Sequence, residues 1–179
     1  MTRPDQAQPS QRPTAKDPPR TYRVSCAPGL SPWLSQEIES LGLSVSGSDH
    51  TGIVTQGNWT DAMRMCLRLR TAYHVLQRFA DIRAVDADML YTESVRLPWE
   101  RVISPDGYVS VISAVQNATI DNSMFPNMRL KDAIVDRIQN VHGRRPNAGS
   151  DRTQSVVHLY WKDDQARISL DLAGQKLSD

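Results

Sequence analysis

A polar segment that leads into an expected helix is the part of this chain best suited to binding an anion. Its neutral side chains are Asn117, Thr119, Asn122 and Ser123. The helix expected over 124–140 begins directly after them, and its first turn presents unpaired N–H groups and partial positive charge, which favour phosphate. Arg129 and Lys131 follow one to two turns along and add full charge. The pattern indicates phosphate binding, and Ser123 as a plain helix cap is a compatible alternative.

A second group of cations follows this helix within eleven residues. It comprises His142, Arg144, Arg145 and Arg152. Arginine can hold a phosphate with two parallel hydrogen bonds. Between residues 117 and 152, however, six Lys or Arg residues stand against four Asp residues, so the local excess is only about +2. A few phosphate contacts give weak, salt-sensitive affinity, and a solvated basic loop is the alternative.

Catalytic and metal-binding patterns are not evident in the sequence. Asp132 and Asp136 have helical i, i+4 spacing, but neither a His nor a third carboxylate is placed to complete a metal site. His158 alternates with apolar neighbours, which favours a core histidine with a hydrogen-bond partner. Nucleophile-elbow, phosphate-loop and dinucleotide motifs are absent. We therefore expect no catalytic residues, no metal and no cofactor in this chain.

The elements that position these residues must come from an ordinary globular composition. The chain has 179 residues, of which 39% are hydrophobic and 23% charged, and its formal net charge is +1. Any polyanion-binding function must then come from a local cluster. Cys26 and Cys66 are too few for a disulfide framework and are expected to be reduced thiols. Neither a long apolar run nor a secretion signal is present, so we expect a cytoplasmic protein with no membrane contact.

The first 84 residues divide into a tail and one βαββαβ unit. Residues 1–20 contain five prolines and little to bury, so disorder is expected. Residues 21–84 should then form strands at 22–26, 45–47, 52–56 and 75–82. Two helices fit between them, the first with Ser31 as its N-cap and Gly42 at its end, the second capped by Asn58. This order is that of a ferredoxin-like domain.

Residues 85–179 read as a second α/β unit. A short helix is expected at 88–94, followed by strands at 108–115 and 155–161, the latter apolar on both faces and therefore central. The helix over 124–140 should bury Leu130, Ala133, Ile134, Ile138 and Val141. The last strand alternates Ala166, Ile168 and Leu170 with Arg167, Ser169 and Asp171, which predicts one exposed face.

Five stretches of this sequence resemble the THUMP-domain RNA methyltransferases, and in particular the large-subunit ribosomal RNA guanine-N2 methyltransferases. They are residues 26–30, 117–123, 131–136, 145–147 and 168–174. The resemblance covers roughly 22–177. It implies an α+β fold in which a ferredoxin-like domain (21–84) precedes a THUMP domain (85–179).

The resemblance also implies that this part of the chain recognises structured RNA, most of all 23S-type ribosomal RNA. By position in the motifs, the implied RNA contacts are Asn117, Thr119, Asn122, Ser123, Lys131, Arg145 and Asn147. Arg129 and Arg144 are added to these expected contacts because they stand in the two cationic segments described above. Asp121 departs from this pattern, since a basic residue would suit phosphate better. S-adenosylmethionine is expected only in a catalytic domain that family members carry after this region, so we expect this chain alone not to methylate. Three alternatives stay open: a module for transfer RNA, a docking module for a separate methyltransferase subunit, and a small stand-alone enzyme, for which the sequence offers no site.

Overall fold

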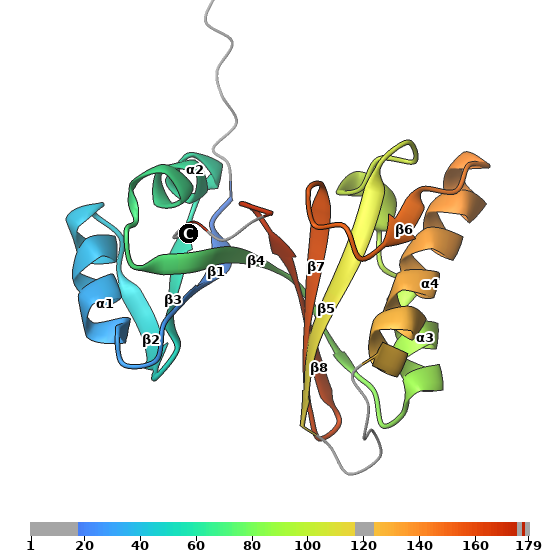
Figure 1. Ribbon diagram of the computed structural model, residues 1–179, viewed down its shortest axis with the longest axis horizontal. Coiled ribbons are helices and arrows are strands. Elements are labelled where there is room, and N and C mark those ends of the chain that lie inside the picture. The colour runs from blue at the N-terminus through green and yellow to red at the C-terminus, as the bar shows by residue number, and fades with distance from the viewer. Residues whose placement is uncertain (1–17, 117–123, 175–176, 178–179) are drawn as a thin grey trace, which may run out of the picture.

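The computed structural model describes residues 18–116, 124–174 and 177. It confirms the α+β class, with eight strands in one sheet of order β2-β3-β1-β4-β8-β7-β5-β6. Figure 1 shows α1 and α2 beside one half of this sheet and α3 and α4 beside the other. No helix among the described residues is long and apolar enough to cross a membrane.

The first half has the βαββαβ order that the sequence predicts. Its elements are β1 (Arg20–Cys26), α1 (Ser31–Ser40), β2 (Val45–Asp49), β3 (Gly52–Gly57), α2 (Trp59–Arg68) and β4 (Ala72–Arg83). Asn58 caps α2 as expected: its side chain accepts from the Asp61 N–H, and the Asp61 side chain accepts from the Asn58 N–H. Ser31, however, is the first residue of α1 and not its cap, because Leu30 takes the N-cap position without a side-chain hydrogen bond. The predicted tail also ends too late, since β1 already begins at Arg20.

The second half contains two α-helices, one short 3-10 helix and four strands. They are α3 (Ala87–Ser94), the short 3-10 helix η1 (Trp99–Arg101), β5 (Tyr108–Gln116), α4 (Met124–His142), β6 (Asn147–Gly149), β7 (Ser155–Lys162) and β8 (Gln165–Asp171). β7 is central as predicted, parallel to β5 and antiparallel to β8. β6 was not expected; it adds an edge strand parallel to β5.

Strand β4 connects the two halves of the sheet. One edge of β4 pairs with β1 from Ala72 to Gln77. The other edge pairs with β8 from Leu76 to Arg83, with a register shift between Arg78 and Ala80. The shift marks a bulge, which increases strand twist. The domain boundary predicted between residues 84 and 85 stays a prediction, and it falls just after this shared strand.

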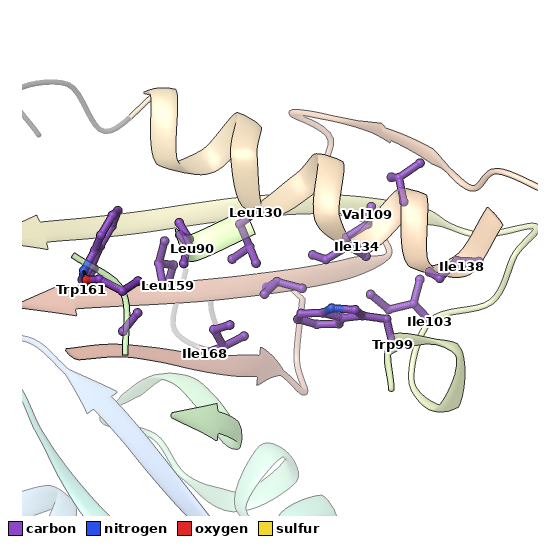
Figure 2. Packing of buried hydrophobic residues seen from close by; sticks show 14 residues of the cluster. Leu90, Trp99, Ile103, Val109, Leu130, Ile134, Ile138, Leu159, Trp161 and Ile168 are labelled. Carbon is purple, nitrogen blue, oxygen red and sulfur yellow. Dashed lines mark hydrogen bonds between the residues drawn. The ribbon is translucent and has the colours of Figure 1, made fainter. Parts of the chain in front are cut away.

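Two apolar clusters form separate cores. One lies under α1 and α2 and includes Tyr22, Leu34, Ile38 and Met65. The other joins α3 and α4 to the sheet (Figure 2), with Leu130, Ile134, Trp99 and Trp161 among its fully buried side chains. Burial of these helix faces is what fixes α4 against β5 and β7.

Two predictions about burial were wrong. Val141 is 47% exposed, because it lies in the last turn of α4 beyond the core that holds Ile138. In β8, Arg167, Ser169 and Asp171 were predicted to form an exposed face, but of these three only Arg167 is exposed. Ser169 is 7% exposed and the Asp171 side chain is fully buried, since His74 and His158 contact its carboxylate.

Candidate nucleic-acid interface

The four neutral donors of the predicted site lie outside the described residues. These are Asn117, Thr119, Asn122 and Ser123, and Asp121 lies there too. The other five predicted contacts are described: Arg129 and Lys131 on α4, Arg144 and Arg145 after it, and Asn147 at the start of β6. What the structure brings together must therefore be judged from these five and their neighbours.

Arg129 and Lys131 point to different sides of α4. Each residue of an α-helix advances by about 100° around the axis, so side chains two positions apart point in nearly opposite directions. The buried side is set by Leu130, Ala133 and Ile134, which pack on the sheet. Arg129 lies on the side of α3, whereas Lys131 lies on the side of β5 and β6. The two cations therefore belong to different surfaces.

On the Lys131 side the surface is hollowed between α4, β5 and the segment after β6, with a volume of about 620 Å³. We call this the α4–β6 hollow. Its lining residues are Ser110, Val111, Met124, Phe125, Asn127, Met128, Lys131, Gly149, Ser150 and Arg152. Lys131 and Arg152 are the two charged residues among them. No ion pair joins either one to an acid within 18–116, 124–174 or 177.

The hollow also has apolar and polar parts that sequence reasoning missed. Phe125 and Met128 are each 46% exposed, although large apolar side chains usually turn inward. Two of its lining residues hold polar atoms, Ser110 Oγ and Asn127 Oδ1, that are buried from solvent and have no hydrogen-bond partner among the described residues. An exposed aromatic ring on a surface that two cations also line suits an unstacked nucleotide base and its phosphates. The sequence did contain a signal for this apolar part: Met124, Phe125 and Met128 do not lie on the helix face that Leu130, Ile134 and Ile138 bury.

Arg129 takes part in a contact between α3 and α4. Its guanidinium donates to Asp88 (2.6 Å) and lies 4.7 Å from the centre of the Tyr91 ring. The Tyr91 hydroxyl donates to Asp136 (2.9 Å), and this hydrogen bond, together with burial, raises the pKa of Tyr91. Arg145 reaches the same Asp136 at 3.4 Å. Arg129 and Arg145 therefore already have carboxylate partners, and the contacts of Arg129 and Tyr91 join α3 to α4.

Two further arginines of the region are paired as well. Arg137 forms two hydrogen bonds with Glu100, at 2.9 and 3.0 Å, and Arg144 lies 2.7 Å from Asp106. Asn147 donates its backbone N–H to Gly107, and its side chain is exposed. The modest positive excess counted in the sequence is thus partly neutralised by acids from α3, η1 and the loop before β5. Lys131 and Arg152 keep their charge toward the hollow.

The Arg137–Glu100 pair gives a pH-dependent prediction. The hydrogen bond from Arg137 lowers the pKa of Glu100 from 4.5 to about 2. A carboxyl with a lowered folded-state pKa stabilises the protein above its unfolded pKa, and that stabilisation is lost as pH falls from 4.5 toward 2. At pH 7 we expect Glu100→Gln to lower the melting temperature by about 2–4 °C. The difference from wild type should shrink between pH 4.5 and pH 3.

Thermal unfolding followed by circular dichroism across that pH range checks this expectation. Glu93→Gln is the matched control, because Glu93 pairs with Arg96 on the exposed surface of α3, and such pairs contribute little. A Glu100→Gln difference that stays constant down to pH 3 would contradict the assigned pKa.

Two family models match the chain. The model described as the RlmL ferredoxin-like domain matches residues 21–76, and the THUMP domain model matches residues 84–171. Together they cover both halves of the sheet. They bear out the resemblance read from the sequence motifs.

The curated relatives have one name in common. Ribosomal RNA large subunit methyltransferase K/L of Syntrophotalea carbinolica is 33% identical over 90% of this chain and 23% of its own length. The protein of that name from Pseudomonas aeruginosa is 32% identical over 86% of this chain and 21% of its own length. The chain thus spans about a fifth of the length of these relatives.

Solved structures show the same fold at lower identity. A predicted N6-adenine-specific DNA methylase from Listeria monocytogenes has a TM-score of 0.76 at 20% identity, over 89% of this chain and 42% of that one. A 4-thiouridine synthetase solved as an RNA complex with bound ATP has a TM-score of 0.52 at 14% identity, over 85% and 41%. At these identities the similarity concerns the fold.

Proposed function

Since the chain belongs to the proteins that join an RlmL ferredoxin-like domain to a THUMP domain, we propose that it is the RNA-binding module of a ribosomal RNA methyltransferase. The observation that carries this proposal is the α4–β6 hollow, which Lys131, Arg152 and the 46% exposed Phe125 line together. Phosphates would contact the two cations, and an unstacked base would lie against the ring. The name of the curated relatives supports ribosomal RNA as the ligand.

The finer parts of the proposal concern chemistry outside these residues. We propose base methylation at guanine N2 with S-adenosylmethionine held by a catalytic domain. The relatives' length supports this division, since this chain matches only 21–23% of them. The module would hold folded RNA while the catalytic domain reaches the base. Its place of action would be the cytoplasm, where bacterial ribosomes are made.

Recognition should depend on RNA shape and backbone more than on sequence. Side chains read an RNA duplex poorly, because its major groove is deep and narrow, whereas loops and ends expose bases for stacking. The five described contacts expected from the sequence remain candidates. Lys131 is supported most directly, because it lines the hollow, while Arg129, Arg144 and Arg145 would have to exchange a carboxylate for a phosphate.

A titration of the whole chain with labelled RNA tests the proposal. The probes are a 23S-type ribosomal RNA hairpin, a transfer RNA and a DNA duplex of matched length, compared by fluorescence anisotropy at two salt concentrations. We expect the hairpin to bind at least tenfold more tightly than the DNA. Equal affinity for hairpin and DNA would mean that only general electrostatic attraction is present.

Transfer RNA or another non-ribosomal RNA is a second candidate ligand. The fold shared with a 4-thiouridine synthetase that was solved with RNA favours it. In the same titration, tighter binding of transfer RNA than of the hairpin would select this candidate. The salt dependence would be similar for both, because the same two cations act.

A docking role for a separate methyltransferase subunit is the third candidate. The outer side of α2 exposes Met63 and Leu67, at 53% and 82%, next to the half-exposed Trp59. Such an apolar strip can meet another protein. Adding the catalytic part of a K/L relative in trans tests it. Co-elution that Leu67→Glu abolishes would support docking, whereas separate elution would leave the RNA role alone.

A further inference from the structure

Two histidines and one aspartate that are far apart in the sequence meet in the middle of the sheet. His74 lies on β4, His158 on β7 and Asp171 at the end of β8. The Asp171 Oδ2 atom lies 2.7 Å from His74 Nδ1 and 3.1 Å from His158 Nε2. The three atoms all lie within 4.8 Å of one another, and the centres of the two imidazole rings are 5.3 Å apart.

The carboxylate of this cluster is held in place by the backbone that follows it. Asp171 Oδ1 accepts the N–H groups of Ala173 (3.0 Å) and Gly174 (3.3 Å). Its side chain is fully buried. Burial raises the pKa of Asp171, but the hydrogen bonds from His158, His74 and Ala173 outweigh it and hold that pKa well below its usual range. The group is therefore a carboxylate, with one oxygen fixed and the other directed at two imidazoles.

The two imidazoles leave access from solvent. Their side chains are 21% and 20% exposed, whereas the Asp171 side chain is fully buried, so an ion would approach the cluster from the side of the two rings. With neutral imidazoles the cluster carries one negative charge, which favours a cation. In the metal-free cluster the nitrogens that face Asp171 donate to its carboxylate. An ion would replace the proton on each of these nitrogens, and each neutral ring would then carry its proton on the other nitrogen.

We propose that His74, Asp171 and His158 form a binding site for a divalent transition-metal cation, with zinc as the preferred ion. Two imidazoles and one carboxylate suit zinc. Ligand atoms in a tetrahedral zinc site lie about 3.3 Å apart, given bonds of about 2.0–2.1 Å. The Asp171–His74 and Asp171–His158 separations of 2.7 and 3.1 Å are shorter than this by about 0.6 and 0.2 Å, and the two imidazole nitrogens lie within 4.8 Å of each other, so small side-chain movements would complete the geometry. The exposed side would hold a water molecule as fourth ligand.

The position of the site gives it a structural consequence. His74 belongs to the half that the RlmL ferredoxin-like model matches, and His158 and Asp171 belong to the THUMP match. A bound ion would connect both halves across β4, β8 and β7. It would therefore stabilise the arrangement of the two halves as well as the cluster itself.

Zinc titration of the tag-free full chain, by calorimetry and by competition with a zinc indicator, tests the proposal. We expect one equivalent to bind and the melting temperature to rise. His74→Ala, His158→Ala and Asp171→Asn should each weaken zinc binding by at least about 10- to 100-fold. Loss of a residue that only supports a ligand already has an effect of that size. His142→Ala is the matched control, because His142 is exposed at the end of α4, and it should bind zinc like wild type.

A second measurement on the wild-type chain avoids variants that do not fold. The chain has four histidines, and their imidazole proton signals can be followed by NMR during the titration. His50→Gln and His142→Gln identify two of the four signals by removing them. We expect the other two signals to shift together and to saturate at one equivalent. No stoichiometric shift, or a shift of the His50 or His142 signal alone, would overturn the site and leave a hydrogen-bonded cluster.

Discussion

The double variant Lys131→Ala/Arg152→Ala is expected to bind the ribosomal RNA hairpin about tenfold more weakly than wild type at moderate salt. Both side chains line the α4–β6 hollow, and neither is paired with an acid among the described residues. Each phosphate that a cation neutralises contributes about 0.7–0.9 to the slope of log affinity against log salt. The slope should therefore fall by about 1.4–1.8 in this variant.

The matched control removes the same charge elsewhere. Arg144→Ala/Arg145→Ala deletes two cations that Asp106 and Asp136 already neutralise, so we expect a smaller loss. Lys131→Ala/Arg145→Ala, chosen from the sequence motifs alone, should fall between the two. Anisotropy titrations at several salt concentrations measure all three. Equal losses would mean that affinity follows net charge and does not depend on the hollow.

The single variant Phe125→Ala separates the base contact from the phosphate contacts. Stacking of a base on an aromatic ring contributes about 1–3 kcal/mol and involves no counterion release. Affinity should fall while the salt slope stays at its wild-type value. If the affinity of Phe125→Ala equals that of wild type, Phe125 is not part of the interface.

Trp99→Ala is expected to cause the largest loss of stability, about 3–5 kcal/mol. Trp99 is fully buried, packs against Phe79 with ring centres 4.7 Å apart, and donates its indole N–H to the Ser94 carbonyl at 2.7 Å. Truncation would leave a cavity under α4 and would remove one of the two hydrogen bonds that the Ser94 carbonyl accepts, the other coming from the Leu97 N–H. The positions of α3 and α4, and hence the hollow, depend on this side chain.

Urea unfolding at pH 7, followed by circular dichroism, measures the effect. Trp33→Ala is the matched control, because Trp33 is 59% exposed on α1, and its loss should change stability by less than about 0.5 kcal/mol. A Trp99→Ala loss below about 1 kcal/mol would show that the core can collapse around the missing ring.

The sequence alone determined the features that depend on residues close together in the chain. The Asn58 cap is formed by side chains three positions apart, and the core side of α4 follows from apolar residues at i, i+3 and i+4. The motifs likewise gave the family, which the RlmL ferredoxin-like and THUMP matches bear out. Ser31 was misplaced because Ser and Leu can each precede a helix, and only the fold selects between them.

Tertiary structure decided which charged and titratable residues meet. Glu100 and Arg137 are 37 residues apart, and His74 and Asp171 are 97 apart. Strand pairing and helix packing bring them together, and no local spacing encodes those contacts. The same is true of the α4–β6 hollow, which joins residues of β5, α4 and the segment after β6. The net charge of a segment can be summed from the sequence alone. The effect of each cation on a ligand, however, depends on whether a carboxylate lies within a few ångströms of it.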